Sequence, residues 1–429
     1  MKVFRANKII LVSIGIVLLA IIVSCTTSYN TYTNRWNLAA IYNPSRSSLH
    51  PSYKIYHNAT ETSILFFKIF TSELAFQPVG NNGEWVSKIS LNYTLTKVGE
   101  NPKAVADSGT IDLSISKKGV NKFYISQVPI KVEMGGSYRL KLLLRDELKR
   151  NFNLHFLDIE KIPEYGQQFF NLTNANGYPI FKNVIIGDGF FRILHASPGS
   201  EKLFISYYKT ESPLPKPTFA VDMDQQILSK PDSLYIIPYD PATSFSLAYD
   251  GRYFIQFDTT KPEGLTLLKF NEDFPKITTP EDLVKPLAYI TTSGEYRELT
   301  ESGNLKLAID NFWINASGST DRGREMIRIY YNRVYFANYY FTSTREGWKT
   351  DRGMVYIVYG PPHNLKKTTN TETWYYYNKK GGEDITFNFD YNPSKYAVNE
   401  YRLLRSESNT WHWREAVYAW TSGEIFLQN

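Results

Sequence analysis

The chain has 429 residues, of which 42% are hydrophobic and 15% aromatic, and its formal net charge is +6. This composition predicts folded, core-forming domains, two or three of ordinary size, and excludes a long disordered region. A charge this small is not that of a nucleic-acid-binding protein, so no nucleic acid is expected as a partner. The single cysteine excludes an intramolecular disulfide, so the cores alone must stabilise the fold.

Residues 1–24 have the pattern of a secretory signal peptide. Basic residues precede an apolar run of 15 residues, Ile9 to Val23, which is shorter than a membrane-spanning helix. Ile22-Val23-Ser24 then leads into Cys25, and the segment resembles a bacterial lipoprotein signal, in which Cys25 becomes the acylated first residue. The alternative is an uncleaved membrane anchor. Several acyl chains would hold the protein on a membrane, since each buried methylene contributes about 0.8 kcal/mol.

The residues after Cys25 bear on localisation. Lipoproteins sorted to the cell surface in the same bacterial group often carry acidic residues there, whereas this chain reads Thr26-Thr27-Ser28-Tyr29-Asn30. We therefore expect the outer membrane and favour its periplasmic face over the cell surface. Residues 25–48 are expected to form a tether.

Two β-sandwich domains are predicted next, residues 49–160 and 161–272. In the first, apolar residues alternate with polar ones, as in Ile89 to Leu95 and Tyr138 to Leu144, which indicates strands with one buried face. Their length and spacing favour an antiparallel sandwich of immunoglobulin-like type. In the second, alternation on both sides of Asp250-Gly251 predicts a hairpin with a tight turn there.

Residues 273–429 are predicted to form an α+β domain. Thr279-Pro280-Glu281-Asp282 reads as a helix start, and helical spacing follows in Leu305 to Phe312 and again from about Asp321 to Phe341. Short strands are expected at 354–358, 373–377, 385–389 and 401–404. The fold class predicted for the whole chain is therefore multidomain and mainly β, with two immunoglobulin-like sandwiches before this α+β domain.

A motif in this last domain resembles a known family. Gly347-Trp348-Lys349-Thr350-Asp351-Arg352-Gly353, followed by Val355 to Pro362, is similar to the signature of the GWxTD domain found chiefly in Bacteroidota-type bacteria. The resemblance covers about residues 280–405 and extends to Phe312-Trp313, Trp374-Tyr375 and Tyr401-Arg402-Leu403. It implies no established activity, because the domain is named for its motif.

The motif can be interpreted as architecture or as a partner-binding surface. Gly347 and Gly353 would bracket a compact loop, Trp348 would pack on the preceding helix, and Thr350 and Asp351 would bond nearby backbone amides. Gly360-Pro361-Pro362 would end the expected strand. The candidate site residues, structural or partner-binding, are Gly347, Trp348, Thr350, Asp351, Arg352, Gly353, Tyr359, Gly360, Pro361 and Pro362.

Catalytic and metal-binding patterns are missing from the sequence. The six histidines show no HExxH motif and no paired i, i+4 spacing, and there is no phosphate-binding loop or GxSxG elbow. Asp351, Arg352 and His363 come nearest to a reactive trio, although a turn-locking ion pair explains the Asp and Arg more simply. We expect no catalytic residue, no metal and no cofactor.

Aromatic residues suggest a second kind of site. Trp374 and Tyr376, with Trp411 and Trp413, could form an exposed platform for a glycan or a protein, or they could be core residues.

Three functions remain open. The favoured one is a non-enzymatic membrane lipoprotein that binds other cell-envelope proteins in an assembly or secretion complex. The alternatives are a glycan-binding lipoprotein and an enzyme of unknown class centred on Asp351.

Overall fold

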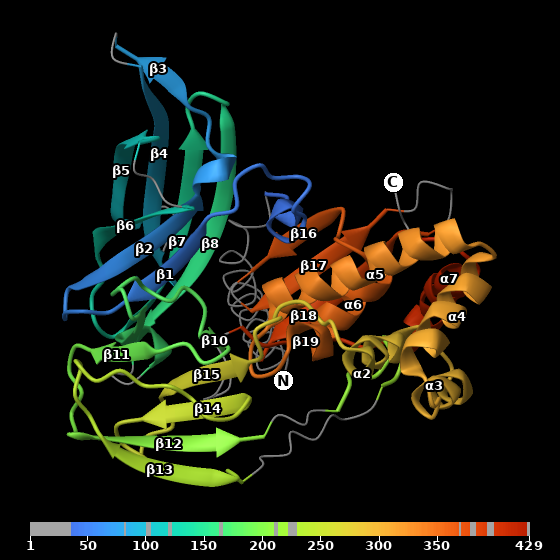
Figure 1. The fold of residues 1–429 in the computed structure, drawn as a ribbon. Coiled ribbons are helices and arrows are strands. Elements are labelled where there is room, and N and C mark those ends of the chain that lie inside the picture. The colour runs from blue at the N-terminus through green and yellow to red at the C-terminus, as the bar shows by residue number, and fades with distance from the viewer. Residues whose placement is uncertain are drawn as a thin grey trace, which may run out of the picture.

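The computed structural model describes residues 36–80, 83–99, 104–118, 122–162, 166–209, 213–221, 230–368, 370–377, 383–392 and 399–426. The predicted signal peptide and Cys25 lie outside these residues. The described residues are mainly β, with 38% in strands and 25% in helices. Figure 1 shows two β units and a C-terminal unit in which helices cover a sheet. No helix in the described part of the chain is long and apolar enough to cross a membrane.

The first β unit consists of two facing sheets. One has the order β1-β2-β6, and the other has the order β3-β4-β7-β8 with β5 also paired to β4. The bounds are β1 Ser52–Tyr56, β2 Thr62–Phe70, β3 Gln77–Val79, β4 Glu84–Lys97, β5 Val105–Ser116, β6 Phe123–Lys131, β7 Gly136–Asp146 and β8 Asn151–Lys161. The alternation expected in β4 and β7 is confirmed, because Ile89, Leu91, Leu140 and Leu142 are buried in one core between the sheets.

The second β unit contains a mixed sheet of five strands and a pair. The order is β10-β15-β14-β12-β13, with β10 parallel to β15, and β11 pairs with β9. The bounds are β9 Phe170–Asn174, β10 Val184–Ile186, β11 Phe191–His195, β12 Lys202–Tyr208, β13 Ser233–Pro238, β14 Gly251–Gln256 and β15 Leu265–Phe270. Short helices η2 (Thr71–Glu73) and η3 (Gln167–Phe169) lie in the connections of the β units.

The predicted hairpin around Asp250-Gly251 is wrong. Gly251 begins β14, but β14 pairs with β12 and β15, while Phe245 exchanges backbone hydrogen bonds with Phe191. The alternation before the turn therefore reflects packing of an irregular segment, in which Leu247 is buried and Tyr249 is exposed. Local turn chemistry was outweighed by pairing with strands distant in sequence.

The C-terminal unit packs helices against an antiparallel sheet of order β16-β17-β18-β19. Its helices are α2 Pro280–Leu283, η4 Lys285–Tyr289, α3 Ser293–Thr300, α4 Leu305–Ser317, α5 Thr320–Phe341, η5 Gly347–Lys349, α6 Asp351–Tyr359, η6 Glu407–Asn409 and α7 Thr410–Thr421. Its strands are β16 Asn364–Lys367, β17 Thr371–Tyr376, β18 Ile385–Tyr391 and β19 Tyr401–Leu403. The predicted N-cap is confirmed, since the Thr279 side chain accepts a hydrogen bond from the Asp282 amide.

The strand predicted at 354–358 is wrong, because these residues belong to helix α6. The Thr350 side chain caps this helix by accepting a hydrogen bond from the Gly353 amide, and Gly360 ends it with a φ of 86°. All residues from Arg352 to Tyr359 are buried. The continuous apolar run from Met354 to Tyr359 is short, and a run of this length is compatible with either a buried strand or a buried helix.

The predicted tether also needs correction at its C-terminal end. Helix η1 (Ala39–Tyr42) and the residues around it belong to the core of the C-terminal unit, where Leu38, Ala39 and Tyr42 are buried. The Leu38 amide donates to the Leu365 carbonyl at 2.9 Å, so this segment lies against β16. The short apolar run Leu38 to Tyr42 explains the docking, because its burial offsets the entropy of ordering a segment without a sheet of its own.

Candidate functional site

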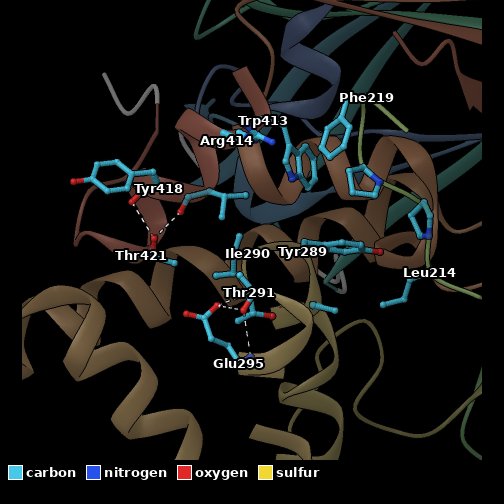
Figure 2. A pocket seen from close by; sticks show the side chains of 15 residues that line it. Leu214, Phe219, Tyr289, Ile290, Thr291, Glu295, Trp413, Arg414, Tyr418 and Thr421 are labelled. Atoms are coloured by element: carbon cyan, nitrogen blue, oxygen red, sulfur yellow. Dashed lines mark hydrogen bonds between the residues drawn. The ribbon is translucent and has the colours of Figure 1, made fainter. Parts of the chain in front are cut away.

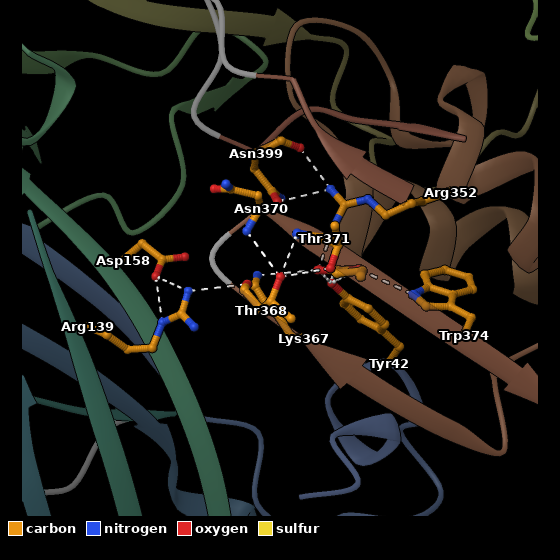
Figure 3. Close-up of polar contacts among 11 residues, drawn as sticks. Tyr42, Arg139, Asp158, Arg352, Lys367, Thr368, Asn370, Thr371, Trp374 and Asn399 are labelled. Carbon is orange, nitrogen blue, oxygen red and sulfur yellow. Dashed lines mark hydrogen bonds and ion pairs between the residues drawn. The ribbon is translucent and has the colours of Figure 1, made fainter. Parts of the chain in front are cut away.

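The C-terminal unit contains a buried charged cluster around Glu372 of β17, and Figure 3 shows the cluster residues Tyr42, Arg352, Lys367 and Trp374. The Glu372 carboxylate accepts hydrogen bonds from the Tyr42 hydroxyl at 3.0 Å and from Arg352 Nη1 at 3.2 Å. It also lies 3.3 Å from Lys367 Nζ and accepts from Trp374 Nε1 at 3.2 Å. The cluster therefore joins the N-terminal segment, helix α6 and the sheet through one carboxylate.

Charge balance keeps Glu372 ionised although its side chain is fully buried. Burial alone would raise the pKa of Glu372, but the cations of Arg352 and Lys367 outweigh burial and hold this pKa below its usual value. The other guanidinium nitrogen, Arg352 Nη2, donates to the Asn399 carbonyl and side-chain oxygens at 2.8 and 3.0 Å. The Arg of the motif is thus committed to internal bonds on both sides.

Asp351 of the motif fixes the start of α6 to the far strand of the sheet. Its carboxylate accepts from the Leu403 amide of β19 at 2.8 Å and forms an ion pair with Arg405 at 2.6 Å. Thr350 behaves as expected, since its hydroxyl caps α6 and donates to the Gly347 carbonyl at 2.7 Å. The prediction for Asp351 was wrong in detail, because its amide partner lies 52 residues away in sequence rather than in the turn.

The two glycines of the motif allow very close backbone contacts. A Cβ on Gly347 would lie 2.0 Å from the Ala337 carbonyl oxygen of α5, and a Cβ on Gly353 would lie 1.9 Å from the Gly347 oxygen. The turn η5 lies against α5, with the Trp348 amide donating to the Asn338 side chain at 3.1 Å, and the buried Trp348 ring contacts Tyr289 of η4. The turn η5 is therefore pressed between α5 and α6 with no room for a side chain at either glycine.

The end of α6 is also part of the interior. Tyr359 is buried, and the Gly360 carbonyl accepts a hydrogen bond from the Tyr376 hydroxyl at 2.9 Å. Arg333 of α5 donates to the carbonyls of Ile357 and Val358, both at 3.0 Å, and so satisfies the last turn of the helix. Pro361 and Pro362 follow, but they terminate a helix rather than the expected strand.

The structure does not assemble Asp351, Arg352 and His363 into one site. Asp351 pairs with Arg405, Arg352 pairs with Glu372, and the His363 Nδ1 atom accepts from the Tyr377 amide at 2.8 Å. Among the described residues, no group of three or more His, Cys, Asp or Glu side chains is placed to hold a metal ion.

Sequence reasoning missed Glu372, Lys367 and Tyr42. A signal for Glu372 existed, because in a strand it shares a face with Trp374 and Tyr376 and so must be buried if they are. Tyr42 had only the weaker signal of a short apolar run, and Lys367 had none.

Most of the proposed aromatic platform is core. Trp374 and Tyr376 are fully buried and Trp413 is 7% exposed, whereas Trp411 is 66% exposed. Tyr418 lies seven residues after Trp411 in α7 and is 71% exposed, so the two rings share one face of the helix. An exposed aromatic surface therefore exists, but only Trp411 of the four predicted residues contributes to it.

A cavity of about 530 Å³ lies beside this helix face (Figure 2). Its walls come from α7, from η4 and the start of α3, and from the segment 213–221. They are mainly apolar, with Leu214, Phe219, Ile290, Trp413 and Val417 among the lining residues. Glu295 contributes a carboxylate that is already bonded to the Thr292 amide and hydroxyl.

A larger cavity of about 810 Å³ lies where the three units meet. It is lined by residues of β1, β8, η1, the end of α5 and the sheet of the C-terminal unit. Arg139 of β7 borders this junction, because it pairs with Asp158 at 2.7 Å and also donates to the Thr368 carbonyl of the C-terminal unit. Burial lowers the pKa of His155, a lining residue, to about 4, so its imidazole is neutral at physiological pH.

These features define a C-terminal α+β unit whose Gly-Trp-x-Thr-Asp turn is bonded into its own core. Residues 251–422 match the family model of the GWxTD domain, so the chain contains a GWxTD domain, as the motif indicated. The match begins at β14, before the predicted boundary at residue 273.

Other comparisons add little. The search of curated proteins gives no match. A crystal structure from Bacteroides fragilis, described as a candidate β-galactosidase, is similar with a TM-score of 0.18 and 11% identity. The match covers 33% of this chain and 20% of that chain, and a likeness this weak carries no argument.

Proposed function

We propose that this protein is a bacterial lipoprotein, anchored to the outer membrane through Cys25, that acts as a non-enzymatic scaffold for other cell-envelope proteins. The observation that carries the proposal is the state of the motif, in which Thr350, Asp351 and Arg352 all bond to groups of the fold itself. Side chains held in this way rigidify a scaffold but are not available to a substrate.

The docked N-terminal segment supports a role close to the membrane. Asn37 lies only 12 residues after Cys25, and its side chain bonds the His363 carbonyl and the Leu365 amide. Even fully extended, 12 residues span at most about 40 Å. A lipid on Cys25 would therefore hold the C-terminal unit near the bilayer, on the periplasmic face in our proposal.

We also propose that both β units are immunoglobulin-like sandwiches. In the first, the order β1-β2-β6 faces β5-β4-β7-β8, and the chain passes from one sheet to the other after β2, β5 and β6, as expected for a sandwich of two antiparallel sheets. In the second, the sheet of five strands faces the pair β9 and β11 across a shared core. Two such units would act as spacers between the anchor and a partner.

Lipidation is tested by metabolic labelling. Cells that express the protein receive an alkyne fatty acid, and the wild-type chain should carry the label while a Cys25→Ser variant should not. A wild-type chain that stays unlabelled would contradict the anchor. Protease accessibility in intact cells then assigns the leaflet, with protection expected for the periplasmic face.

Partner binding is tested by photo-crosslinking in intact cells. A photoreactive residue replaces exposed side chains on different units, Leu234 of β13 and Trp411 of α7, which are 57% and 66% exposed. A discrete crosslinked envelope protein, recovered again after gentle detergent extraction, is expected. Recovery of this lipoprotein alone under both conditions would sink the scaffold proposal.

Glycan binding is the second candidate, favoured by one observation. Trp411 and Tyr418 expose their rings on one face of α7, and Tyr418 also borders the cavity shown in Figure 2. Aromatic faces of this kind stack on sugar rings. Polysaccharide gel retardation that is lost with Trp411→Ala and Tyr418→Ala, but kept with Tyr235→Ala on the second β unit, would support it. No retardation by any polysaccharide tested would remove it.

A further inference from the structure

The edge of strand β8 borders the larger cavity, which lies where the three units meet and is called the junction cavity below. Every residue from Asn153 to Asp158 lines the cavity, although successive side chains of a strand point to opposite faces. Six consecutive lining residues are possible only if the open edge of the strand, rather than one face, runs along the cavity. Figure 1 shows β8 on the flank of the first β unit that faces the C-terminal unit.

Part of this edge already carries hydrogen bonds that resemble strand pairing. The Glu160 amide donates to Gln168 Oε1, and Gln168 Nε2 donates to the Asp158 carbonyl, each at 2.9 Å. These bonds show that Asp158 and Glu160 direct backbone groups away from β7. Because outward and inward residues alternate along an antiparallel strand, Leu154 and Phe156 direct their amides and carbonyls outward as well.

The outward backbone groups of Leu154 and Phe156 have no hydrogen-bond partner among the described residues. The side chains of the same wall are also incompletely satisfied. Within the described part of the chain, His50 Nε2, Tyr53 Oη and Asn153 Oδ1 are buried without a partner. Buried polar groups are nearly always bonded in folded proteins, so this concentration on one wall of the cavity, from β8, β1 and the residues before β1, indicates a place for a polar ligand.

The carboxylate of Glu160, at one end of this edge, favours a ligand with a basic group. Asp158 is paired with Arg139, whereas Glu160 forms no ion pair with any described residue. Partial burial and the neighbouring Asp158 raise the pKa of Glu160, and this carboxylate, exposed at the rim of the cavity, has no cationic partner in the described part of the chain. A ligand with a basic group would supply one.

We propose that the junction cavity binds an extended peptide segment of a partner protein, which pairs with the free edge of β8 and places a basic side chain beside Glu160. Unmet amides and carbonyls repeating every two residues match the backbone of another strand and do not match a sugar. This inference rests on the proposed scaffold function and names the kind of partner segment that the scaffold would hold.

The probe is a random decapeptide display library, selected on the chain from residue 25 with Cys25→Ser. A synthetic consensus peptide is then titrated against matched proline variants. Phe156→Pro removes an outward amide at the cavity without breaking a bond to β7, and Phe152→Pro removes an equally outward amide of β8 outside the cavity. We expect the affinity to fall at least tenfold with Phe156→Pro and less than twofold with Phe152→Pro.

The peptide itself provides the second measurement, which needs no change to the protein. N-methylation of alternate peptide amides should abolish binding in one register only. A third measurement does change the protein: Glu160→Gln should weaken the binding of a peptide with Lys more than the binding of the same peptide with norleucine in place of Lys. The proposal is overturned if the library yields no binder, if both registers tolerate methylation, or if a polysaccharide displaces the peptide from β8. Recovery of an envelope partner crosslinked at Leu234 or Trp411 would still leave the scaffold function standing in that case.

Discussion

The motif turn and the junction cavity differ in the hydrogen bonding of their polar groups. In the turn from Gly347 to Gly353, each polar side chain of Thr350, Asp351 and Arg352 has found partners, and two glycines allow backbone contact. Along the cavity, backbone groups of β8 and the hydroxyl of Tyr53 lack partners in the described part of the chain. The comparison shows that the signature residues are bonded into the fold itself, whereas the unmet polar groups, at which we propose binding, lie outside the signature.

The largest expected effect comes from closing the space at the motif. Gly353→Ala would place a Cβ 1.9 Å from the Gly347 oxygen, and backbone on both sides cannot move easily, so we expect a loss of about 4 kcal/mol or more in the free energy of unfolding. Urea unfolding followed by tryptophan fluorescence measures it. Gly303→Ala is the control, because nothing lies within 4 Å of its Cβ position. Equal effects of the two changes would refute the close-packed motif.

Removing the motif cation should cost almost as much. Arg352→Met leaves the Glu372 carboxylate buried with less compensation, and breaking a buried pair in this way costs about 3–5 kcal/mol. Urea titration at pH 7 checks the value. Arg324→Met interrupts a pair with Asp321 in which both side chains are at least 79% exposed, so less than about 1 kcal/mol is expected.

A further variant separates charge from packing in the same cluster. Arg352→Met combined with Glu372→Gln removes both charges, and this double variant should be more stable than Arg352→Met alone. A double variant that is no more stable than Arg352→Met would mean that the loss in Arg352→Met comes from the missing bonds to Asn399 and not from the charge left on Glu372.

Tyr42→Phe tests whether the N-terminal segment belongs to the motif region. Its hydroxyl donates to the ionised Glu372, and a bond to a charged group contributes about 2 kcal/mol. We expect that loss in urea unfolding, together with faster hydrogen exchange of the Leu38 amide, which pairs with Leu365. Unchanged exchange at Leu38 would show that the segment is held independently of the cluster.

Lys54 sharpens the comparison through pH. Unlike Arg352, it has no described acidic partner and donates to the Ile180 carbonyl of the second β unit at 2.9 Å. Burial lowers its pKa to about 7. The unfolded chain keeps the proton up to about pH 10.4, so above pH 7 it binds more protons than the folded chain and stability rises with pH.

The size of this effect is about 1 kcal/mol between pH 7 and pH 8. Lys54→Met should remove that much of the slope in a series of urea titrations across this interval. Lys88→Met, an exposed lysine of β4 in the same unit, should leave the slope unchanged. A slope that persists in Lys54→Met would assign the pH dependence to other groups.

The elements that could be predicted from the sequence are those with one wet face and one dry face. The period of two in β4 and the helical period of α5 both require water on one side, and Thr279 announces its helix by a local hydrogen bond. Helix α6 is buried from Arg352 to Tyr359 and contains a short continuous apolar run, which the pattern does not distinguish from a buried strand, so its residues were assigned to a strand. The position of η1 in the core depends on contacts across more than 300 residues, which no local pattern contains.

The residues of the site also differ in how far their roles could be predicted from local sequence. The capping role of Thr350 and the place of Trp348 beside α5 follow from short-range rules and were predictable. Asp351 pairs with Arg405, which follows β19, and Arg352 pairs with Glu372 of β17, both distant in sequence. The sequence therefore indicated only an ion pair, and it paired Asp351 and Arg352 with each other instead.

The smallest effect gives the sharpest contrast, because it should have the opposite sign to that of Tyr42→Phe. Tyr53→Phe removes a hydroxyl that is buried at the cavity without a partner among the described residues, so folding no longer has to strip that group of water. We expect stability to stay the same or to rise by up to about 1 kcal/mol in urea unfolding at pH 7. A loss of about 2 kcal/mol, matching Tyr42→Phe, would mean that the hydroxyl is already satisfied. The cavity wall would then be as complete as the motif, and the division between folding and binding regions would fail.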